Sequence, residues 1–388
     1  MEEWKEYKLG ELSIDKGSYG IGASAVPYSP SLHTYLRITD INDDGTLNKN
    51  GLMSLDDENA DDYILQPNDI VFARTGNSTG RSYFYDGSDG KLVYAGFLIK
   101  FSLDSKKVNP RILKYYTHSK PYFDWVRSFD TGGTRGNINA KTYGDMPIVL
   151  PPRKLQDKIV SILKSLDDKI EVNRKINENL EQQAQALFKS WFVDFEPFKN
   201  GEFVESELGM IPKGWRVGTF GEIMTIASGK RPPKKESSFS HECNIPLVGA
   251  SDIMGYTNSV LFNEDILVTG RVGTHGIVQR FNYPCWPSDN TLVLKSDYYE
   301  YCYQILCTID YASLNRGSTQ PLITQTDIKN QIILIPPYSV LSDFEKYAST
   351  LMEAKENNQR SSRRLAELRD TLLPKLMSGE FKVNEIVR

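Results

Sequence analysis

Residues 155–192 read LQDKIVSILKSLDDKIEVNRKINENLEQQAQALFKSWF and follow directly on Pro151 and Pro152. Apolar residues recur in this stretch in steps of three and four, the pattern of a long amphipathic helix with a heptad seam. The predicted seam positions are Ile159, Ile162, Leu166, Asn173, Ile176, Leu180 and Leu187. At ~1.5 Å per residue the helix would be ~57 Å long, which suits a spacer.

A second stretch near the C-terminus repeats this pattern. Adding 185 to each number gives Phe344, Tyr347, Leu351, Asn358, Ser361, Leu365 and Leu372. An asparagine occupies the same seam position in both copies, and a lone asparagine there typically fixes the pairing register. Two matched helices in one chain are expected to pair with each other. A plain two-helix hairpin or a homodimer seam fits the periodicity equally well. The flanking sequence is therefore needed to distinguish these arrangements.

The flanking sequence is also repeated. Residues 69–76 and 265–273 each read as a short buried strand that runs into a glycine turn. A proline pair introduces each long helix, as residues that end a strand and permit a helix start would. The matching segments are 4–12 with 215–223, 69–76 with 265–273, 132–138 with 317–323, and 148–152 with 333–337. The chain is therefore a tandem duplication of a globular unit followed by a helix.

The predicted boundaries follow from this repeat. Strands are predicted at residues 92–101 and 291–295, and helices at residues 111–127 and 298–311. Residues 1–150 and 197–336 form two mixed α/β domains, whereas 151–196 and 337–388 form the helical spacers and the tail. The predicted fold class is α+β with pseudo-two-fold symmetry inside one polypeptide.

Composition excludes several kinds of protein. The 388 residues suffice for two or more domains, and no run approaches the ~20 apolar residues that a membrane helix needs. With no basic and apolar leader at its start, the chain is expected to be cytoplasmic. Its four cysteines lack CxxC spacing and its four histidines are scattered, so no metal site and no Cys/His or Ser/His/Asp site is expected.

Catalytic motifs are missing as well. A base-amino methyltransferase needs an Asp, Asn or Ser before Pro-Pro-Tyr/Phe to hold the amino group, but Ile335 and Leu150 stand at those positions. Residues 76–81 are too short for a phosphate loop and lack its lysine. The acid pairs Asp43 with Asp44 and Asp56 with Asp57 fit a solvated loop better than a nuclease or glycosidase site. We therefore expect no catalytic residue and no cofactor bound by this chain.

Polar, glycine-rich loops in both halves carry the side chains that read base edges and bind phosphate. A net charge of −4 does not exclude a basic face, because residues 40–69 hold nine acids against Lys49 alone. Ordinary surface turns would explain any one of these residues, but not their recurrence at matching places. The predicted DNA-binding residues are Arg74, Asn77, Ser78, Thr79, Arg81, Thr134, Arg135 and Asn137 in the first half, and Lys230, Arg231, Lys234, Arg271, Thr274, His275, Ser318, Thr319 and Gln320 in the second.

Four motifs resemble one family, the specificity subunits of type I restriction-modification enzymes. They are LDDKIE at residues 166–171 with the Asn-rich segment 173–179, QALFKSWFVDF at 185–195, IPKGW at 211–215, and LRDTLLPKLMSGE at 368–380. The resemblance covers essentially the whole chain. It implies two target-recognition domains, each reading one half of a bipartite double-stranded DNA site, separated by an antiparallel coiled coil of the two long helices.

The resemblance also implies partners. The helices would dock two methyltransferase subunits that carry S-adenosylmethionine, and through them two restriction subunits driven by ATP and Mg²⁺. The chain itself would be the non-catalytic subunit of a DNA adenine methyltransferase and endonuclease complex. In an antiparallel pair, equivalent positions meet only near the centre, so Asn173 and Asn358 are predicted to lie together at mid-coil.

Four aromatic residues end the first helix and exceed what a two-helix seam needs. We expect some of Phe188, Trp191, Phe192 and Phe195 to cover a methyltransferase subunit, and the alternative is packing against the chain's own second globular unit. Two other functions remain open: an enzyme in its own right, which the missing motifs disfavour, and a coiled-coil adaptor without DNA contact.

Overall fold

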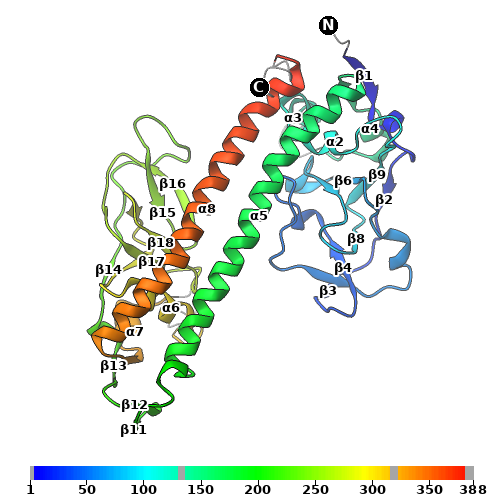
Figure 1. Ribbon diagram of the computed structural model, residues 1–388. Helices are drawn as coiled ribbons and strands as arrows, with labels where there is room; N and C mark the ends of the chain where they lie inside the picture. Colours follow the sequence, from blue (N-terminus) through cyan, green and yellow to red (C-terminus); the bar gives the residue numbers. More distant parts are fainter. Residues whose placement is uncertain (1–3, 130–135, 315–321, 381–388) are drawn as a thin grey trace. The chain divides into compact units, whose positions relative to one another are not determined.

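The computed structural model describes residues 4–129, 136–314 and 322–380. The chain forms two compact units (Figure 1). Unit 1 contains Met1–Val172 and Ser361–Arg388, and unit 2 contains Asn173–Arg360. This division cuts each long helix near its middle, whereas the sequence-based boundaries treat the helices as separate segments. The cut has a physical cause, because each half-helix shares an apolar core with its globular domain.

The core of unit 1 is covered by an antiparallel sheet with the order β2-β9-β6-β7. Its strands are β2 (Ser18–Tyr19), β9 (Leu98–Ser102), β6 (Asp69–Ala73) and β7 (Ser82–Tyr85). All five residues of β6 are buried, as the sequence pattern predicted. A second sheet has the order β3-β5-β4-β8, in which β4 and β8 are parallel. Its strands are β3 (Val26–Pro27), β5 (Met53–Leu55), β4 (His33–Leu36) and β8 (Leu92–Tyr94).

The remaining elements of unit 1 include a strand pair at the start of α5 and four short α-helices. β1 (Lys5–Lys8) pairs antiparallel with β10 (Pro147–Leu150), which leads into α5. The short helices are α1 (Leu9–Leu12), α2 (Arg111–Tyr116), α3 (Lys120–Arg127) and α4 (Ala140–Gly144).

Unit 2 repeats this topology. Its antiparallel sheet has the order β14-β20-β17-β18, with strands β14 (Thr225–Ser228), β20 (Thr291–Lys295), β17 (Ile266–Gly270) and β18 (Val278–Phe281). A smaller sheet, β16-β15-β19, again contains one parallel pair, β15 with β19. Its strands are β16 (Ile253–Thr257), β15 (Ile245–Val248) and β19 (Trp286–Pro287). The duplication seen in the sequence is therefore a duplication of sheet order and strand direction.

The other elements of unit 2 also have counterparts in unit 1, with one exception. β13 (Arg216–Thr219) pairs with β21 (Ile332–Ile335) as β1 pairs with β10. The helices of the domain are α6 (Tyr299–Thr308) and α7 (Gln325–Lys329). The exception is a hairpin of β11 (Phe203–Ser206) and β12 (Gly209–Pro212), which follows the first long helix.

Two predicted elements are each split in the structure. The strand predicted at residues 92–101 is β8 and β9, which lie in different sheets, because the chain turns between Ala95 and Leu98. The helix predicted at residues 111–127 is α2 and α3. The break follows from Pro121 in the first turn of α3, since proline has no N–H to continue the hydrogen bonds of α2.

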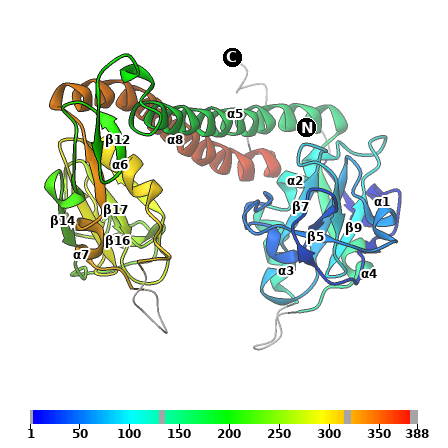
Figure 2. The ribbon, with the colours of Figure 1, turned by 90° about the horizontal axis from the view of Figure 1, so that it is seen from below.

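The long helices are α5 (Arg153–Phe192) and α8 (Tyr338–Ser378), and each begins directly after its proline pair as predicted. In unit 2 they run antiparallel, since Asn177 of α5 bonds to Asn358 and Glu181, one turn later, bonds to Lys355. In unit 1 the start of α5 shares a core with the end of α8 through Ile159, Leu163, Leu373 and Leu376 (Figures 1 and 2).

The predicted meeting of the two asparagines is confirmed. Nδ2 of Asn173 lies 3.5 Å from the carbonyl oxygen of Asn358, and Nδ2 of Asn358 donates to Oδ1 of Asn177 at 3.2 Å. Two seam assignments are wrong: Ile176 is 42% exposed and Tyr347 is 57% exposed, whereas Ala348 is buried. A straight α-helix drifts by ~20° per heptad, which moves the contact to the neighbouring residue.

Candidate nucleic-acid interface

An arginine directly follows β6 in unit 1 and β17 in unit 2, and the two arginines have equivalent backbone hydrogen bonds. In unit 1, the Arg74 N–H donates to the carbonyl of Phe97 at 3.1 Å, and the Ile138 N–H donates to the Arg74 carbonyl at 3.0 Å. In unit 2, the Arg271 N–H donates to the carbonyl of Asn290 at 2.8 Å, and the Ile323 N–H donates to the Arg271 carbonyl at 3.0 Å.

These bonds define an equivalent backbone position in the two units. Phe97 immediately precedes β9 and Asn290 immediately precedes β20, which are equivalent strands. Ile138 and Ile323 are separated by the same 185 residues that relate the two long helices. The structure therefore brings together the two segments that the sequence analysis had matched separately in each half.

Arg74 is held by two side chains. Its guanidinium lies over the Tyr19 ring, 5.0 Å from the centroid, and its Nε donates to Oδ1 of Asn137 at 3.3 Å. The Tyr19 oxygen accepts a hydrogen bond from the Ala140 N–H at the start of α4, at 3.1 Å. Tyr19 was not among the residues predicted from sequence, because only the pairing of β2 with β9 in the same sheet as β6 brings it to Arg74.

The other predicted DNA-binding residues of unit 1 differ in their exposure to solvent and in their contacts within the chain. Ser78 is only 6% exposed, which argues against a DNA contact. Thr79 turns its hydroxyl to the carbonyl of Gly76 at 2.8 Å. Arg81 is engaged by the Ile41 carbonyl at 3.1 Å and by the Asp43 carboxylate at 2.7 Å. Asn77 and Asn137 are exposed, and Thr134 and Arg135 lie outside the described residues.

In unit 2, too, some predicted DNA-binding residues are exposed and others already contact groups of the chain. Lys230 and Arg231 are exposed. Lys234 contacts Glu242 at 2.8 Å and Glu236 at 3.0 Å, and these hydrogen bonds raise its pKa above the ordinary value. Among the other predicted residues, Thr274 is exposed, Nδ1 of His275 lies 3.2 Å from the Gly270 carbonyl, and Ser318, Thr319 and Gln320 lie outside the described residues.

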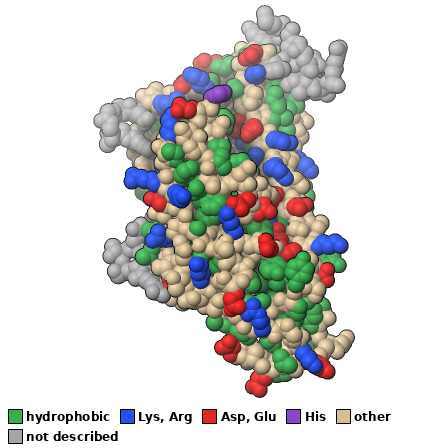
Figure 3. All heavy atoms as spheres, turned by 90° about the vertical axis from the view of Figure 1, so that its left-hand side faces the viewer, with side chains coloured by type: hydrophobic (Ala, Val, Ile, Leu, Met, Phe, Trp, Pro, Cys, Tyr) green, Lys and Arg blue, Asp and Glu red, His purple; other side chains and the backbone are tan. Residues whose placement is uncertain are grey.

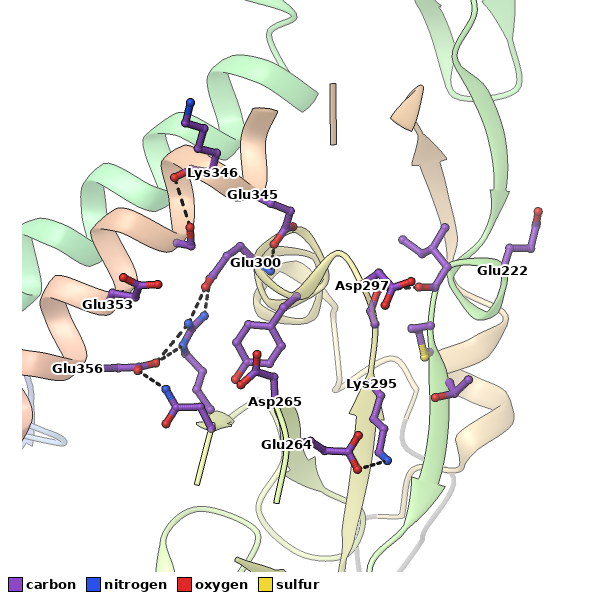
Figure 4. A pocket seen from close by; sticks show the side chains of 18 of the residues that line it. Glu222, Glu264, Asp265, Lys295, Asp297, Glu300, Glu345, Lys346, Glu353 and Glu356 are labelled. Atoms are coloured by element: carbon purple, nitrogen blue, oxygen red, sulfur yellow. Dashed lines mark hydrogen bonds and ion pairs between the residues drawn. The ribbon is translucent and has the colours of Figure 1, made fainter. Parts of the chain in front are cut away.

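Unit 2 also contains a cavity of about 880 Å³ with a strongly acidic lining (Figure 4). Its carboxylates are those of Glu222, Glu264, Asp265, Asp297, Glu300, Glu345, Glu353 and Glu356, against the cations Arg280, Lys295 and Lys346. Because phosphate binding requires an excess of Lys and Arg, this cavity is unsuited to a DNA backbone. On the face in Figure 3, Lys and Arg side chains are scattered rather than gathered into one basic patch.

One carboxylate of this cavity has a strongly displaced titration. Glu345 of α8 accepts hydrogen bonds at 2.9 Å from the N–H groups of Glu300 and Tyr301 at the start of α6. Burial raises the pKa of Glu345 to about 7, despite these two bonds. The group therefore changes charge near neutral pH.

The aromatic residues at the end of α5 pack against the core of unit 2. Phe192 is 4% exposed and lies 4.7 Å from Tyr301 and 4.9 Å from Phe344, centroid to centroid. Phe188, Trp191 and Phe195 are partly buried against the same core. Packing within the chain thus accounts for Phe192, and a partner could reach only the exposed parts of the other three.

The described part of the chain contains neither a metal-binding cluster nor a membrane-spanning helix. Residues 4–129, 136–314 and 322–380 contain no group of three or more His, Cys, Asp or Glu side chains that could hold a metal ion. No helix in these ranges combines the length and the apolar character needed to cross a membrane.

A family model and two known proteins each match most of this chain. The family model for the type I restriction modification DNA specificity domain matches residues 1–182 and 212–359. The MjaIX specificity subunit of Methanocaldococcus jannaschii is 32% identical over 71% of this chain and 69% of its own length. The HindI specificity subunit of Haemophilus influenzae is 23% identical over 98% of this chain and 100% of its own length.

A solved structure has the same fold. The crystal structure of the type I restriction-modification S subunit from M. genitalium matches 97% of this chain and 96% of its own, with a TM-score of 0.58 and 16% sequence identity. The family model alone covers most of the chain, including both recognition units. The chain therefore belongs to the family of type I restriction-modification DNA specificity subunits.

Proposed function

We propose that this chain reads a bipartite DNA site, one half-site with each unit, as part of a type I restriction-modification complex. The observation that carries the proposal is the repeated sheet order, β2-β9-β6-β7 and β14-β20-β17-β18, with an arginine in the same backbone position of each sheet. Two similar but unequal domains suit a target with two different halves. With both domains on one side of B-DNA, the half-site centres would lie ~10 bp apart.

The long helices would fix the distance between the half-sites. α5 has 40 residues and α8 has 41, so each is ~60 Å long. The antiparallel register and the buried Asn173 support a defined pairing, because a polar residue at a seam position specifies register.

The chain would bind no cofactor and would catalyse no reaction by itself. Methylation would be carried out by two methyltransferase subunits with S-adenosylmethionine, and cleavage by two restriction subunits with ATP and Mg²⁺. Support comes from the missing motifs in the sequence: neither proline pair follows an Asp, Asn or Ser, and no phosphate loop is present. Such a complex acts on DNA in the cytoplasm.

Genome-wide mapping of methylated adenines tests the proposal. Two strains are compared, one with the chain and its methyltransferase and one in which only this chain is deleted. We expect methylation at one split motif, with two short defined halves and a fixed gap, which disappears on deletion. A continuous motif, or a methylome that is unchanged by the deletion, would contradict the proposal. Methylation or cleavage by the isolated chain would instead show an enzyme in its own right.

The methyltransferase contact has a separate test. Trp191 is partly buried and contacts the exposed ring of Tyr347 edge to face, with 6.1 Å between the ring centroids, so this pair can extend a partner's apolar surface. We expect Trp191→Ala to reduce co-purification of the methyltransferase subunit. Ile176→Ala removes an exposed apolar group from the same helix and serves as the control. Normal recovery of the complex with Trp191→Ala would contradict the proposed contact between Trp191 and the methyltransferase subunit.

A further inference from the structure

Arg74 and Arg271, unlike Arg81 and Lys234, have no carboxylate partner among the residues that the structure describes. Among the residues that the structure describes, neither arginine forms an ion pair, and the two Nη atoms of Arg74 have no hydrogen-bond acceptor. Arg81 and Lys234, in contrast, are already paired with Asp43 and with Glu236 and Glu242. To bind a new acceptor through the same N–H donors, a paired cation has to release its carboxylate.

Arg74 is also preorganised. The Tyr19 ring supports one face of the guanidinium, and Asn137 accepts its Nε–H. Both contacts leave the Nη edge free to donate in parallel. The Tyr19 ring is itself positioned by the Ala140 N–H, and the adjacent backbone packs closely, since a Cβ atom at Gly20 would lie 2.2 Å from the Tyr94 carbonyl oxygen. Holding the guanidinium in place before binding reduces the entropy lost on binding.

The backbone of Arg271 is fixed by the same two hydrogen bonds as that of Arg74. Gly229, the counterpart of Gly20, packs equally closely, since a Cβ atom there would lie 2.1 Å from the Ser288 carbonyl oxygen. Next to Gly229, Lys230 is exposed and donates only its backbone N–H, to the Pro287 carbonyl at 3.0 Å. Arg271 and Lys230, which have no carboxylate partner among the described residues, thus lie at the corresponding edge of unit 2.

The chemistry of this arrangement selects guanine. Two parallel N–H donors on a planar guanidinium match the O6 and N7 acceptors of guanine in the major groove, whereas adenine offers one acceptor and one donor there. We propose that Arg74 and Arg271 are the specificity-determining residues of the two units, each reading a guanine in its own half-site. Tyr19 is then a positioning residue that acts through Arg74. This inference rests on the proposed function.

The test uses the complex reconstituted with its methyltransferase subunit. Binding is measured to the methylated motif as found in the genome, to duplexes with each defined base changed singly, and to an unrelated duplex. We expect Arg74→Ala and Arg271→Ala each to weaken binding to the intact motif by about 5- to 150-fold. Each variant should stop discriminating at a single guanine, in one half-site for Arg74 and in the other for Arg271. Arg81→Ala, the paired-cation control, should retain discrimination at every position.

Two further variants separate base reading from phosphate binding and from misfolding. Arg74→Lys keeps the charge but loses the planar fork, so it should lose discrimination while the salt dependence of binding stays unchanged. Tyr19→Phe keeps the ring but loses the hydrogen bond from the Ala140 N–H, so it should keep more discrimination than Tyr19→Leu, which should resemble Arg74→Lys. A melting temperature equal to that of the parent chain shows that a variant is folded.

Several outcomes would overturn the inference. One is a uniform loss of affinity for all duplexes with a salt slope lower by about 1, which marks a phosphate contact. Another is unchanged discrimination in Arg74→Ala and Arg271→Ala while the parent complex reads a split motif. The latter result leaves the proposed function intact. A parent complex with no sequence preference would remove the proposed function and this inference together.

Discussion

The carboxylate of Asp167 on α5 accepts a hydrogen bond from the Arg369 guanidinium on α8 at 3.0 Å. The same carboxylate accepts from Lys114 at 2.7 Å and from the Tyr115 hydroxyl at 3.0 Å, both on α2. One acidic side chain therefore joins both long helices to the recognition domain of unit 1. In unit 2, Glu181 has the corresponding role, since it contacts Lys355 of α8 and accepts from the Tyr303 hydroxyl of α6 at 3.0 Å.

Asp167→Asn should destabilise unit 1 by about 1.5–3 kcal/mol, the range for hydrogen bonds to charged groups. The substitution removes the carboxylate partner of Lys114 and leaves Arg369 with Asp370 alone, although both cations are about three-quarters buried. Denaturant unfolding at neutral pH measures the effect. Asp168→Asn is the matched control, because Asp168 is 57% exposed and pairs with the exposed Lys164 one turn away, so its loss should cost less than ~0.5 kcal/mol. Equal costs for the two variants would contradict the joining role of Asp167.

The Asp167 substitution should also change the acid limb of the stability curve. Burial alone would raise the pKa of Asp167, but Lys114 and Arg369 outweigh it and hold the pKa below the ordinary value. A depressed pKa contributes stability above the pKa of the unfolded chain, and that stability is lost as pH falls through the folded value. The parent chain should therefore lose stability below about pH 4 more steeply than Asp167→Asn.

Glu345 has the opposite pH dependence. Its pKa is raised from 4.5 to about 7, so its contribution is complete below about pH 4.5 and is lost as pH rises towards 7, when the buried carboxyl must ionise beside Glu300 and opposite Arg280. We expect Glu345→Gln to gain stability relative to the parent as pH rises from 5 to 8. Thermal melts at both pH values measure this difference. Glu353→Gln, an exposed position two turns along α8, should show no such gain.

Gly20→Ala should destabilise unit 1 by about 1–3 kcal/mol, the usual cost of inserting an atom into a packed site. Its Cβ would lie 2.2 Å from the Tyr94 carbonyl oxygen and 2.4 Å from the Ala95 carbonyl oxygen, so the backbone itself must shift. Gly22→Ala is the control in the same segment, because its Cβ would have no neighbour within 4 Å. Comparison of the two unfolding midpoints decides whether packing, rather than loss of glycine flexibility, sets the cost.

Removal of one heptad from both long helices tests whether they set the gap in the DNA site. Deletion of residues 169–175 together with residues 361–367 shortens both helices by ~10 Å, the rise of about 3 bp of B-DNA. Methylation mapping of this double deletion should give the same two half-sites with a gap shorter by about 3 bp. Deletion from α5 alone should abolish methylation, because the antiparallel register of the helices no longer matches. An unchanged gap in the double deletion would exclude the helices as the spacer.

Sequence alone predicted the tandem repeat, the two helices with their proline starts, and the meeting of Asn173 with Asn358. These features follow from local periodicity and from identical residues at a constant offset, both of which are written along the chain. The candidate DNA-binding loops were proposed on the same ground, and their contact with DNA stays a prediction. Their residues form the right chemical set in both halves, with an arginine after the central buried strand.

Only the tertiary structure decided which of the predicted DNA-binding side chains are exposed and not already paired with a carboxylate. Arg74 and Arg81 look alike in the sequence, yet Arg74 lies over Tyr19 while Arg81 is paired with Asp43. Ser78 is polar and was predicted in a loop, but it lies buried in a short 3-10 helix. Each of these outcomes depends on contacts between residues far apart in the chain, such as Tyr19 with Arg74 through β2, β9 and β6. Periodicity reports which face of an element is apolar, whereas the pairing of a charged side chain depends on what the fold places beside it.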